Sequence, residues 1–328
     1  MKKKGSVLSG LLEKISSSSM ATDVISDPQV PATMMFMCLY EILDNCDHRW
    51  VIHLRASQDF MRKRQQLQVP FTQKSGYEDL TMFAERYFAF QDVISRTACG
   101  NSPLFGVEYW QRPNQSRDID AWMGCSPSMA SLIFKITELA RSRNNGDVPK
   151  EEFEREAEEL GRELNVLNSN TVVLDSLDDT LRRCAELKNV SVELYFHCLL
   201  RDAHPGSPHV SQLVADILPS VYDLVKKGCV AGLLFPLFVA AVELSPLDDD
   251  DIFGPIEGTS KLSGRRLVLE ILNAMEGSSL FNIERTTAVI LKVWRMRDLR
   301  AEQGHQPEGS KNDWHAFVNP YTQNLSLA

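Results

Sequence analysis

Residues 233–243, LLFPLFVAAVE, carry one charged side chain, which stands at the last position. A helix that is apolar on every side has to lie inside a large protein core or inside a membrane. The apolar stretch extends only over 229–244, which is shorter than the roughly 20 residues of a membrane-spanning helix, and Pro236 lies inside it. We therefore expect an interior helix, a domain large enough to surround it, and no membrane span.

Apolar residues recur at steps of three and four along most of the chain, a spacing that predicts helices. No strand-like alternation persists, and no repeat of fixed period is present. Ser126 followed by Pro127 is typical of a helix start, because serine caps free N–H groups and proline fits the first turn. We predict an all-α fold, a single large helical domain of about a dozen helices. Besides the interior helix, we expect helices at 31–43, 47–67, 78–98, 126–140, 149–164, 174–200, 210–225, 265–275 and 283–300, with shorter ones at 103–110 and 313–318.

The chain divides into three expected parts. Residues 1–29 are predicted to be a flexible N-terminal segment, 30–320 the helical domain, and 321–328 a tail. Inside the domain, 245–264 is predicted to be an exposed loop. It contains the run Asp248–Asp251 with three glycines and two prolines, and glycine and proline interrupt helices.

Charge and cysteine content restrict the class of protein. The net charge is −9, and the only early basic run is Lys2–Lys4, whereas proteins that bind duplex DNA concentrate positive charge against the phosphates. We therefore expect no DNA-binding residues in this chain. The seven cysteines are odd in number and form no CxxC pair, which argues against a secreted disulfide framework and favours reduced thiols in the cytosol or nucleus.

Motifs for catalysis are missing from the sequence. Neither a GxxxxGK[ST] nor a GxGxxG loop is present, and Gly124-Cys125-Ser126 lacks the second glycine of a nucleophile elbow. Asp248–Asp251 is similar to the aspartate runs that hold magnesium in all-helical terpene synthases, but it lies in a loop and no second polar motif accompanies it. We predict that the protein is not an enzyme, and an all-helical synthase is the least favoured alternative.

Four residues between 197 and 209 have side chains that suit zinc, namely His197, Cys198, His204 and His209. His197 and Cys198 are adjacent and would point in different directions on a helix. His204 and His209 flank a turn that contains two prolines. We therefore expect no metal site and no cofactor in this chain.

Several separate segments resemble, in the same order, the pattern of one protein family. They are 35–43 (MFMCLYEIL), 50–56 (WVIHLRA), 86–93 (RYFAFQDV), 119–126 (IDAWMGCS), 133–140 (IFKITELA), 235–243 (FPLFVAAVE), 282–298 (NIERTTAVILKVWRMRD) and 313–314 (DW). Together they are similar to the regulatory domain that follows the binuclear zinc cluster in fungal zinc-cluster transcription factors. The sequence departs from that pattern at Arg55, where glycine is usual, at Gln91, where histidine is usual, and at Phe235, where tryptophan is usual.

The resemblance implies an all-α regulatory domain in a nuclear protein that controls transcription by RNA polymerase II. It also implies a homodimer, with a tryptophan-rich surface on the last helices as the candidate contact. Family members read DNA through a cluster of six cysteines that this sequence does not contain, whether that part is outside the chain at hand or naturally missing. DNA and zinc are therefore expected only through such a cluster.

The resemblance further suggests a small-molecule site, since yeast sterol-responsive relatives bind a lipid in this domain. A hydrophobic or sterol-like effector needs a concave, mostly apolar pocket. The candidate lining residues are Phe235, Phe238, Val242, Trp294 and Met296. Ordinary core packing of the same side chains is the alternative interpretation.

A second class of function is that of an interaction protein. The acidic segment 151–163 and the run Asp248–Asp251 are candidates for binding a transcriptional coregulator or for covering a basic DNA-binding region of the same protein. Charge runs of this kind are more often solvated faces.

Overall fold

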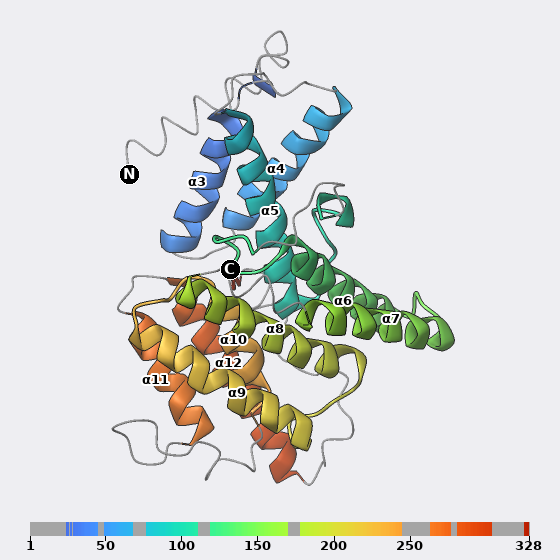
Figure 1. Cartoon of the computed structure of the whole chain (residues 1–328), viewed down its shortest axis with the longest axis vertical. Helices are drawn as coiled ribbons and strands as arrows, with labels where there is room; N and C mark the ends of the chain where they lie inside the picture. The colour runs from blue at the N-terminus through green and yellow to red at the C-terminus, as the bar shows by residue number, and fades with distance from the viewer. Residues whose placement is uncertain are drawn as a thin grey trace.

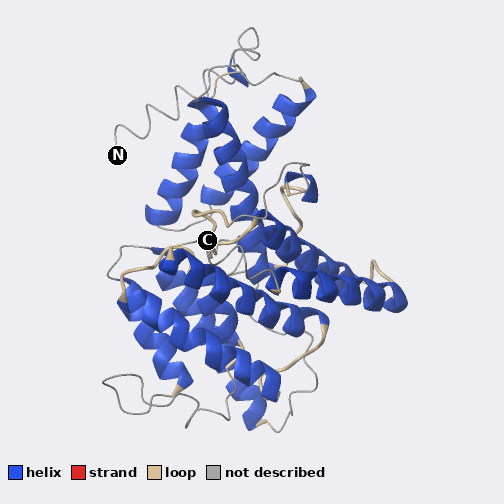
Figure 2. Cartoon of the chain, viewed as in Figure 1, coloured by secondary structure: helices blue, strands red, loops and turns tan. Residues whose placement is uncertain are grey.

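Helices make up the regular structure of the chain (Figure 2). The computed structural model describes residues 24–25, 27, 29–44, 49–67, 77–110, 119–169, 178–244, 263–276, 281–303 and 325–327. Within these ranges no strand is present, and the one β element is an isolated bridge between Asp120 and Cys125. The all-α prediction is confirmed.

The described ranges contain ten α-helices and one short 3-10 helix, slightly fewer than the dozen expected. They are α3 (Gln29–Asp44), α4 (Arg49–Gln66), α5 (Tyr77–Cys99), η1 (Val107–Tyr109), α6 (Pro127–Asn145), α7 (Lys150–Asn168), α8 (Asp179–Leu200), α9 (Pro208–Lys226), α10 (Leu234–Val242), α11 (Gly264–Glu276) and α12 (Phe281–Glu302).

The helices form two groups, which are joined through α5 and α6 and by a direct contact between α3 and α12 (Figure 1). Helices α3, α4 and α5 pack against one another in the upper group, and α8 to α12 form the lower one. Helices α6 and α7 pair as a hairpin that projects to one side, which we call the α6–α7 arm. Buried apolar side chains from both groups belong to one continuous core, so the chain is a single domain.

Helix α10 lies at the centre of the lower group, where it contacts α8, α9, α11 and α12. All of its residues, 234–242, are buried. The expectation of an interior helix is therefore confirmed, and its apolar character on every side follows from the four neighbours around it. None of the helices within the described ranges is long and apolar enough to cross a membrane.

Local signals fix several helix ends. The hydroxyl of Ser126 accepts a hydrogen bond from the backbone N–H of Met129 at 3.2 Å, and Pro127 occupies the first turn of α6, as the sequence predicts. The same serine–proline pair opens α9, where the hydroxyl of Ser207 accepts from the N–H of Val210 at 3.4 Å. Helix α6 ends at Asn145 and is capped by Gly146, whose φ of 77° is left-handed and favours glycine.

Some predicted boundaries differ from the observed ones. The helix expected at 174–200 begins at Asp179, because the carboxylate of Asp178 caps it by accepting from the N–H of Thr180. The short helix expected at 103–110 is reduced to the 3-10 turn η1. The predicted loop 245–264 lies outside the described residues except at its end, where α11 begins, and the short helix at 313–318 lies wholly outside them.

Both ends of the chain contribute described residues to the core. Val24 and Ile25, from the segment predicted to be flexible, are buried, and the carbonyl of Ile25 accepts from Arg64 at 3.2 Å. In the predicted tail, 325–327 are buried, and the backbone carbonyl of Ser326 accepts from the side chain of Asn282 at 3.2 Å. These short segments therefore belong to the packed domain.

Candidate functional site

The five residues proposed to line a ligand pocket come from α10 and α12, two helices that contact each other. Phe235, Phe238, Val242 and Trp294 are at most 4% exposed, and Met296 is partly buried against the same core. Neither of the two surface cavities described below is lined by any of them. The side chains occupy the positions of ordinary core packing, and the ligand pocket stays a prediction.

The C-terminal end of α10 is held by side chains from α12. The indole Nε1 of Trp294 donates to the carbonyl of Ala241 at 2.7 Å, and the guanidinium of Arg297 donates to the carbonyl of Val242. The last carbonyls of a helix lack their full set of partners within the helix. The carbonyl of Ala241 also accepts from the backbone N–H of Leu244 at 3.4 Å, and the bonds from Trp294 and Arg297 add side-chain donors to these buried acceptors.

A buried ion pair reinforces this junction. Arg297 Nη2 lies 3.5 Å from Glu243 Oε1, and the side chains are only 8% and 3% exposed. The positive charge also lies at the C-terminal end of α10, which carries the negative end of the helix dipole. The pKa of the Cys198 thiol on α8 is raised well above its usual range, mainly by burial and to a smaller extent by the negative charge of Glu243. This cysteine therefore stays protonated.

Helix α11 joins the same junction through Arg265. Its guanidinium forms two parallel hydrogen bonds with the carboxylate of Asp298, at 2.8 and 2.7 Å, and lies 5.2 Å above the ring of Trp294. We call this set, Glu243, Arg265, Trp294, Arg297 and Asp298, the α10–α12 clamp. Through these contacts the segments 235–243 and 282–298 pack against each other, which the sequence alone did not predict.

The prediction that a tryptophan-rich surface on the last helices forms a contact is wrong for Trp294. That side chain is 4% exposed because it lies between α10 and Arg265. Trp314 lies outside the described residues.

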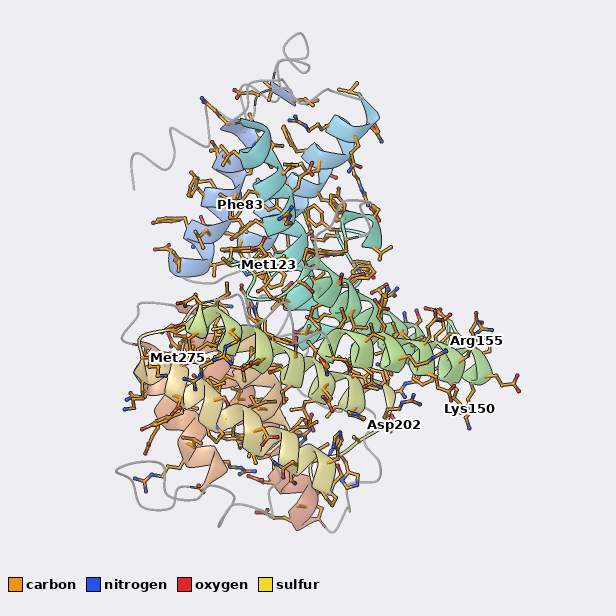
Figure 3. The ribbon with its side chains drawn as sticks, viewed as in Figure 1. Phe83, Met123, Lys150, Arg155, Asp202 and Met275 are labelled. Carbon is orange, nitrogen blue, oxygen red and sulfur yellow. The ribbon has the colours of Figure 1, made fainter. Side chains whose placement is uncertain are left out.

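A second junction forms around the segment 119–126, where the upper and lower groups meet. Met123 is fully buried and lies between the two groups in the view of Figure 3. The carboxylate of Asp120 accepts from the N–H groups of Trp122 and Met123, at 2.9 and 3.2 Å, and closes a tight turn through Gly124, whose φ is 63°. Lys188 of α8 donates to the carbonyl of Met123. This segment is therefore a structural turn followed by a helix cap.

The Lys188 ammonium is buried against this turn and lies 5.3 Å from the ring of Phe90. Burial lowers its pKa. A Cβ added at Gly124 would lie 3.3 Å from Lys188 Nζ, which leaves little room for a larger residue. The pKa of the Cys125 thiol is raised, mainly by burial, so it is a poor nucleophile.

A scan against protein-family models matches the fungal specific transcription factor domain over residues 1–328. The chain belongs to this family. The resemblance drawn from the separate segments is thereby confirmed, and family membership supports a regulatory role in fungal transcription and a non-enzymatic protein. No curated protein and no solved structure matches the chain.

Fungal transcription factors of the zinc-cluster type carry a six-cysteine centre, and the described cysteines of this domain do not fit one. Cys184 and Cys229 form a pair with sulfur atoms 3.8 Å apart. Over the ranges that the structure describes, the one group of three or more possible metal ligands is Glu193, His197 and His209, which contains no thiolate.

Two surface cavities lie along α7 of this fungal transcription factor domain. One, of about 380 Å³, lies between α7 and α8, and its lining includes Glu158, Arg162, Glu193, His197 and Arg201. The other, of about 600 Å³, is a groove between η1, α6 and α7, which we call the acidic groove. Its charged lining residues are Lys135, Glu138, Asp147, Glu152, Glu156, Glu159 and Glu163, and its apolar ones are Val107, Phe134, Leu139, Val148 and Leu160.

The acidic groove combines an apolar floor with a negative rim. Glu138 and Glu163 already have basic partners, since Arg141 lies 3.0 Å from Glu138 and Lys135 lies 2.8 Å from Glu163. For Glu156 and Glu159 the described residues supply no basic partner. The sequence predicted the acidic face of α7, but the contribution of α6 depends on how the arm folds back on itself.

The outer face of α7 is exposed, and Lys150 and Arg155 lie toward the far end of the arm (Figure 3). Phe153, Ala157 and Leu160 form the buried stripe that attaches α7 to α6. The negative rim is therefore accessible to a partner.

Proposed function

We propose that this fungal transcription factor domain regulates transcription by docking a lysine- and arginine-rich amphipathic segment in the acidic groove. The observation that carries the proposal is the composition of the groove, in which five glutamates and one aspartate surround an apolar floor and Lys135 is the one basic lining residue. The net charge of −9 adds a favourable long-range field for a basic partner.

A basic amphipathic helix matches both parts of this surface. Its apolar face would cover the partly exposed Val107 and Val148, and its positive side chains would lie opposite Glu156 and Glu159. Complementary charges at a rim mainly increase the association rate and select the partner. Such a segment could belong to a transcriptional coregulator or to the basic DNA-binding region of a transcription factor.

The docking proposal is tested with a synthetic helix that has lysines on one face and leucines on the other. Glu156→Lys/Glu159→Lys reverses the two rim charges, and we expect its affinity to be about tenfold lower, since each reversed contact contributes roughly 0.5–1 kcal/mol. The matched control is Glu151→Lys/Glu154→Lys, which changes the net charge of α7 equally but lies outside the groove lining.

Fluorescence anisotropy measures binding of the labelled helix at low and at physiological salt, where exposed charges are screened differently. Equal affinity in the two double variants would show that binding reflects net charge and would contradict a groove. Absence of binding by the unaltered protein would contradict the proposal outright.

Homodimerisation, a sterol-like effector and location in the nucleus are further parts of the proposed regulatory role. An effector in contact with Phe238 and Trp294 would require α10 and α12 to separate, because both side chains are buried. Native mass spectrometry of the purified protein measures oligomer size and any copurified small molecule together. A monomer without added mass would count against both the dimer and the effector.

A further inference from the structure

Three side chains with metal-binding chemistry converge where α8 leads into α9. Glu193 and His197 lie one helical turn apart on α8, so they share one face of that helix. His209 lies in the first turn of α9 and approaches from the neighbouring helix. Each residue offers one ligand atom, and the three atoms all lie within 4.8 Å of one another.

The candidate ligand atoms are somewhat farther apart than in a formed zinc site. The imidazole rings of His197 and His209 are nearly perpendicular, at 85°, with their centroids 4.4 Å apart. Glu193 Oε1 lies 4.0 Å from His209 Nε2, which is too long for a hydrogen bond. Ligand atoms in a tetrahedral zinc site are about 3.4 Å apart when the metal–ligand distances are about 2.0–2.2 Å. Since the His209 side chain is 51% exposed, it has room for the small rotation that would close this gap.

Neighbouring residues hold the cluster in place. The side-chain amide of Asn168 donates to Glu193 Oε2 at 3.4 Å, which leaves Oε1 toward the histidines. Arg143 of α6 donates to the carbonyl of Leu199 at 2.7 Å and pairs with Asp202 at 3.1 Å, so the turn between α8 and α9 is fixed. A hydrogen bond to a ligand, such as that from Asn168 to Glu193, orients the ligand and strengthens metal binding.

We propose that Glu193, His197 and His209 form a reversible zinc-binding site that links α8 to α9. Two imidazoles and one carboxylate suit zinc, and three protein ligands leave the fourth position to water. Magnesium and calcium favour all-oxygen sites and fit this donor set less well. The inference does not depend on the acidic groove.

Arg201 is the unfavourable charge near the site. It lines the same cavity as Glu193 and His197, and its guanidinium lies 5.6 Å from the ring of Phe196. Its repulsion of a cation weakens binding, so the site takes up and releases zinc. Because only the folded protein brings α8 and α9 together, bound zinc raises the thermal unfolding midpoint.

The test is titration of the purified full chain with Zn²⁺ in competition with a chromophoric chelator. We expect His197→Gln and His209→Gln each to weaken binding more than about tenfold, and Asn168→Ala to weaken it about tenfold, since outer contacts contribute 10–100-fold. His204→Gln, a histidine of the same turn outside the cluster, is the matched control and is expected to leave binding unchanged. Visible absorption of bound Co²⁺ reports whether the coordination is tetrahedral.

Circular dichroism separates loss of the site from loss of the fold, and the exposed His209 is the variant expected to fold normally. Zinc that still binds after both histidine replacements overturns the proposal. So does zinc binding that disappears when the adjacent Cys184 and Cys229 are replaced by serine, because the thiol pair would then be the ligand. Absence of binding by the unaltered protein also overturns it.

Discussion

Arg297→Met removes the positive member of the buried ion pair in the α10–α12 clamp. Arg297 makes two contacts that methionine cannot replace, an ion pair with Glu243 and a hydrogen bond to the carbonyl of Val242. Methionine covers much of the same apolar surface, so the loss reflects charge and hydrogen bonding more than packing. Glu243, 3% exposed, stays behind in the core without its Arg297 partner.

The expected magnitude follows from this burial. Removing one partner of a buried ion pair costs about 3–5 kcal/mol, and losing the bond to a buried carbonyl adds about 1 kcal/mol. Arg297→Met should therefore lower the free energy of unfolding by ~4–6 kcal/mol, out of the 5–15 kcal/mol typical of a domain. Glu243→Leu/Arg297→Met removes both charges and should regain roughly 3 kcal/mol of that loss.

Urea unfolding followed by circular dichroism measures both variants, with tryptophan fluorescence as the second probe of a two-state transition. Arg266→Met is the matched control on α11. Arg266 pairs with Glu270 at 3.3 Å, but the side chains are 69% and 38% exposed. Exposed pairs contribute about 0–1 kcal/mol, so this control should remain close to the unaltered protein.

Two outcomes would refute the reasoning about the clamp. If Arg297→Met and Arg266→Met lose similar stability, burial does not set the cost of breaking the pair. If the double variant is as unstable as the summed single variants Glu243→Leu and Arg297→Met, the two side chains are not energetically coupled.

Three further predictions concern Asp92, Ser126 and Trp294. Burial raises the pKa of Asp92 from 3.8 to about 6, although Arg96 and two backbone N–H groups lower it. Between these values the folded protein holds a proton that the unfolded chain releases, so the free energy of unfolding falls as pH rises, by roughly 3 kcal/mol in total. The asparagine of Asp92→Asn does not titrate, so this variant should not lose the same stability between about pH 4 and pH 7. The urea midpoint of the variant minus that of the unaltered protein should therefore be larger at about pH 7 than at about pH 4. An equal difference at the two pH values would contradict the raised pKa. Ser126→Ala removes the cap that accepts from Met129 and should cost about 1 kcal/mol in urea unfolding, whereas an unchanged midpoint would mean that the cap contributes nothing. Trp294→Phe removes the 2.7 Å bond to the last turn of α10 and should cost about 1–3 kcal/mol, and a thermal midpoint equal to that of the unaltered protein would argue against this bond.

Much of the secondary structure could be predicted because its signals are local. Helical spacing identified most helices, and the pair Ser126–Pro127 placed the start of α6 where the cap geometry has it. The start of α8 was placed too early, since helical spacing alone does not show which residue caps the helix. Asp178 does so here.

The candidate sites were less accessible to prediction because their members come from different helices. Phe238 and Trp294 were expected to face a pocket, and an apolar side chain gives the same sequence signal whether it lines a cavity or fills the core. The spacing Glu193-x-x-x-His197 was the available sign of a shared helix face. It could not indicate that His209 lies opposite.

The sequence by itself determined that this chain is helical, that 234–242 is interior, and that Cys198 and His197 point in different directions. These features depend on the spacing and polarity of residues close together in the sequence. The tertiary structure alone decided which charged side chains meet. Arg297 reaches Glu243 and His209 reaches His197 only after α8, α9, α10 and α12 have packed. Contacts between helices distant in sequence depend on packing angles and helix ends, and no local spacing records either of them.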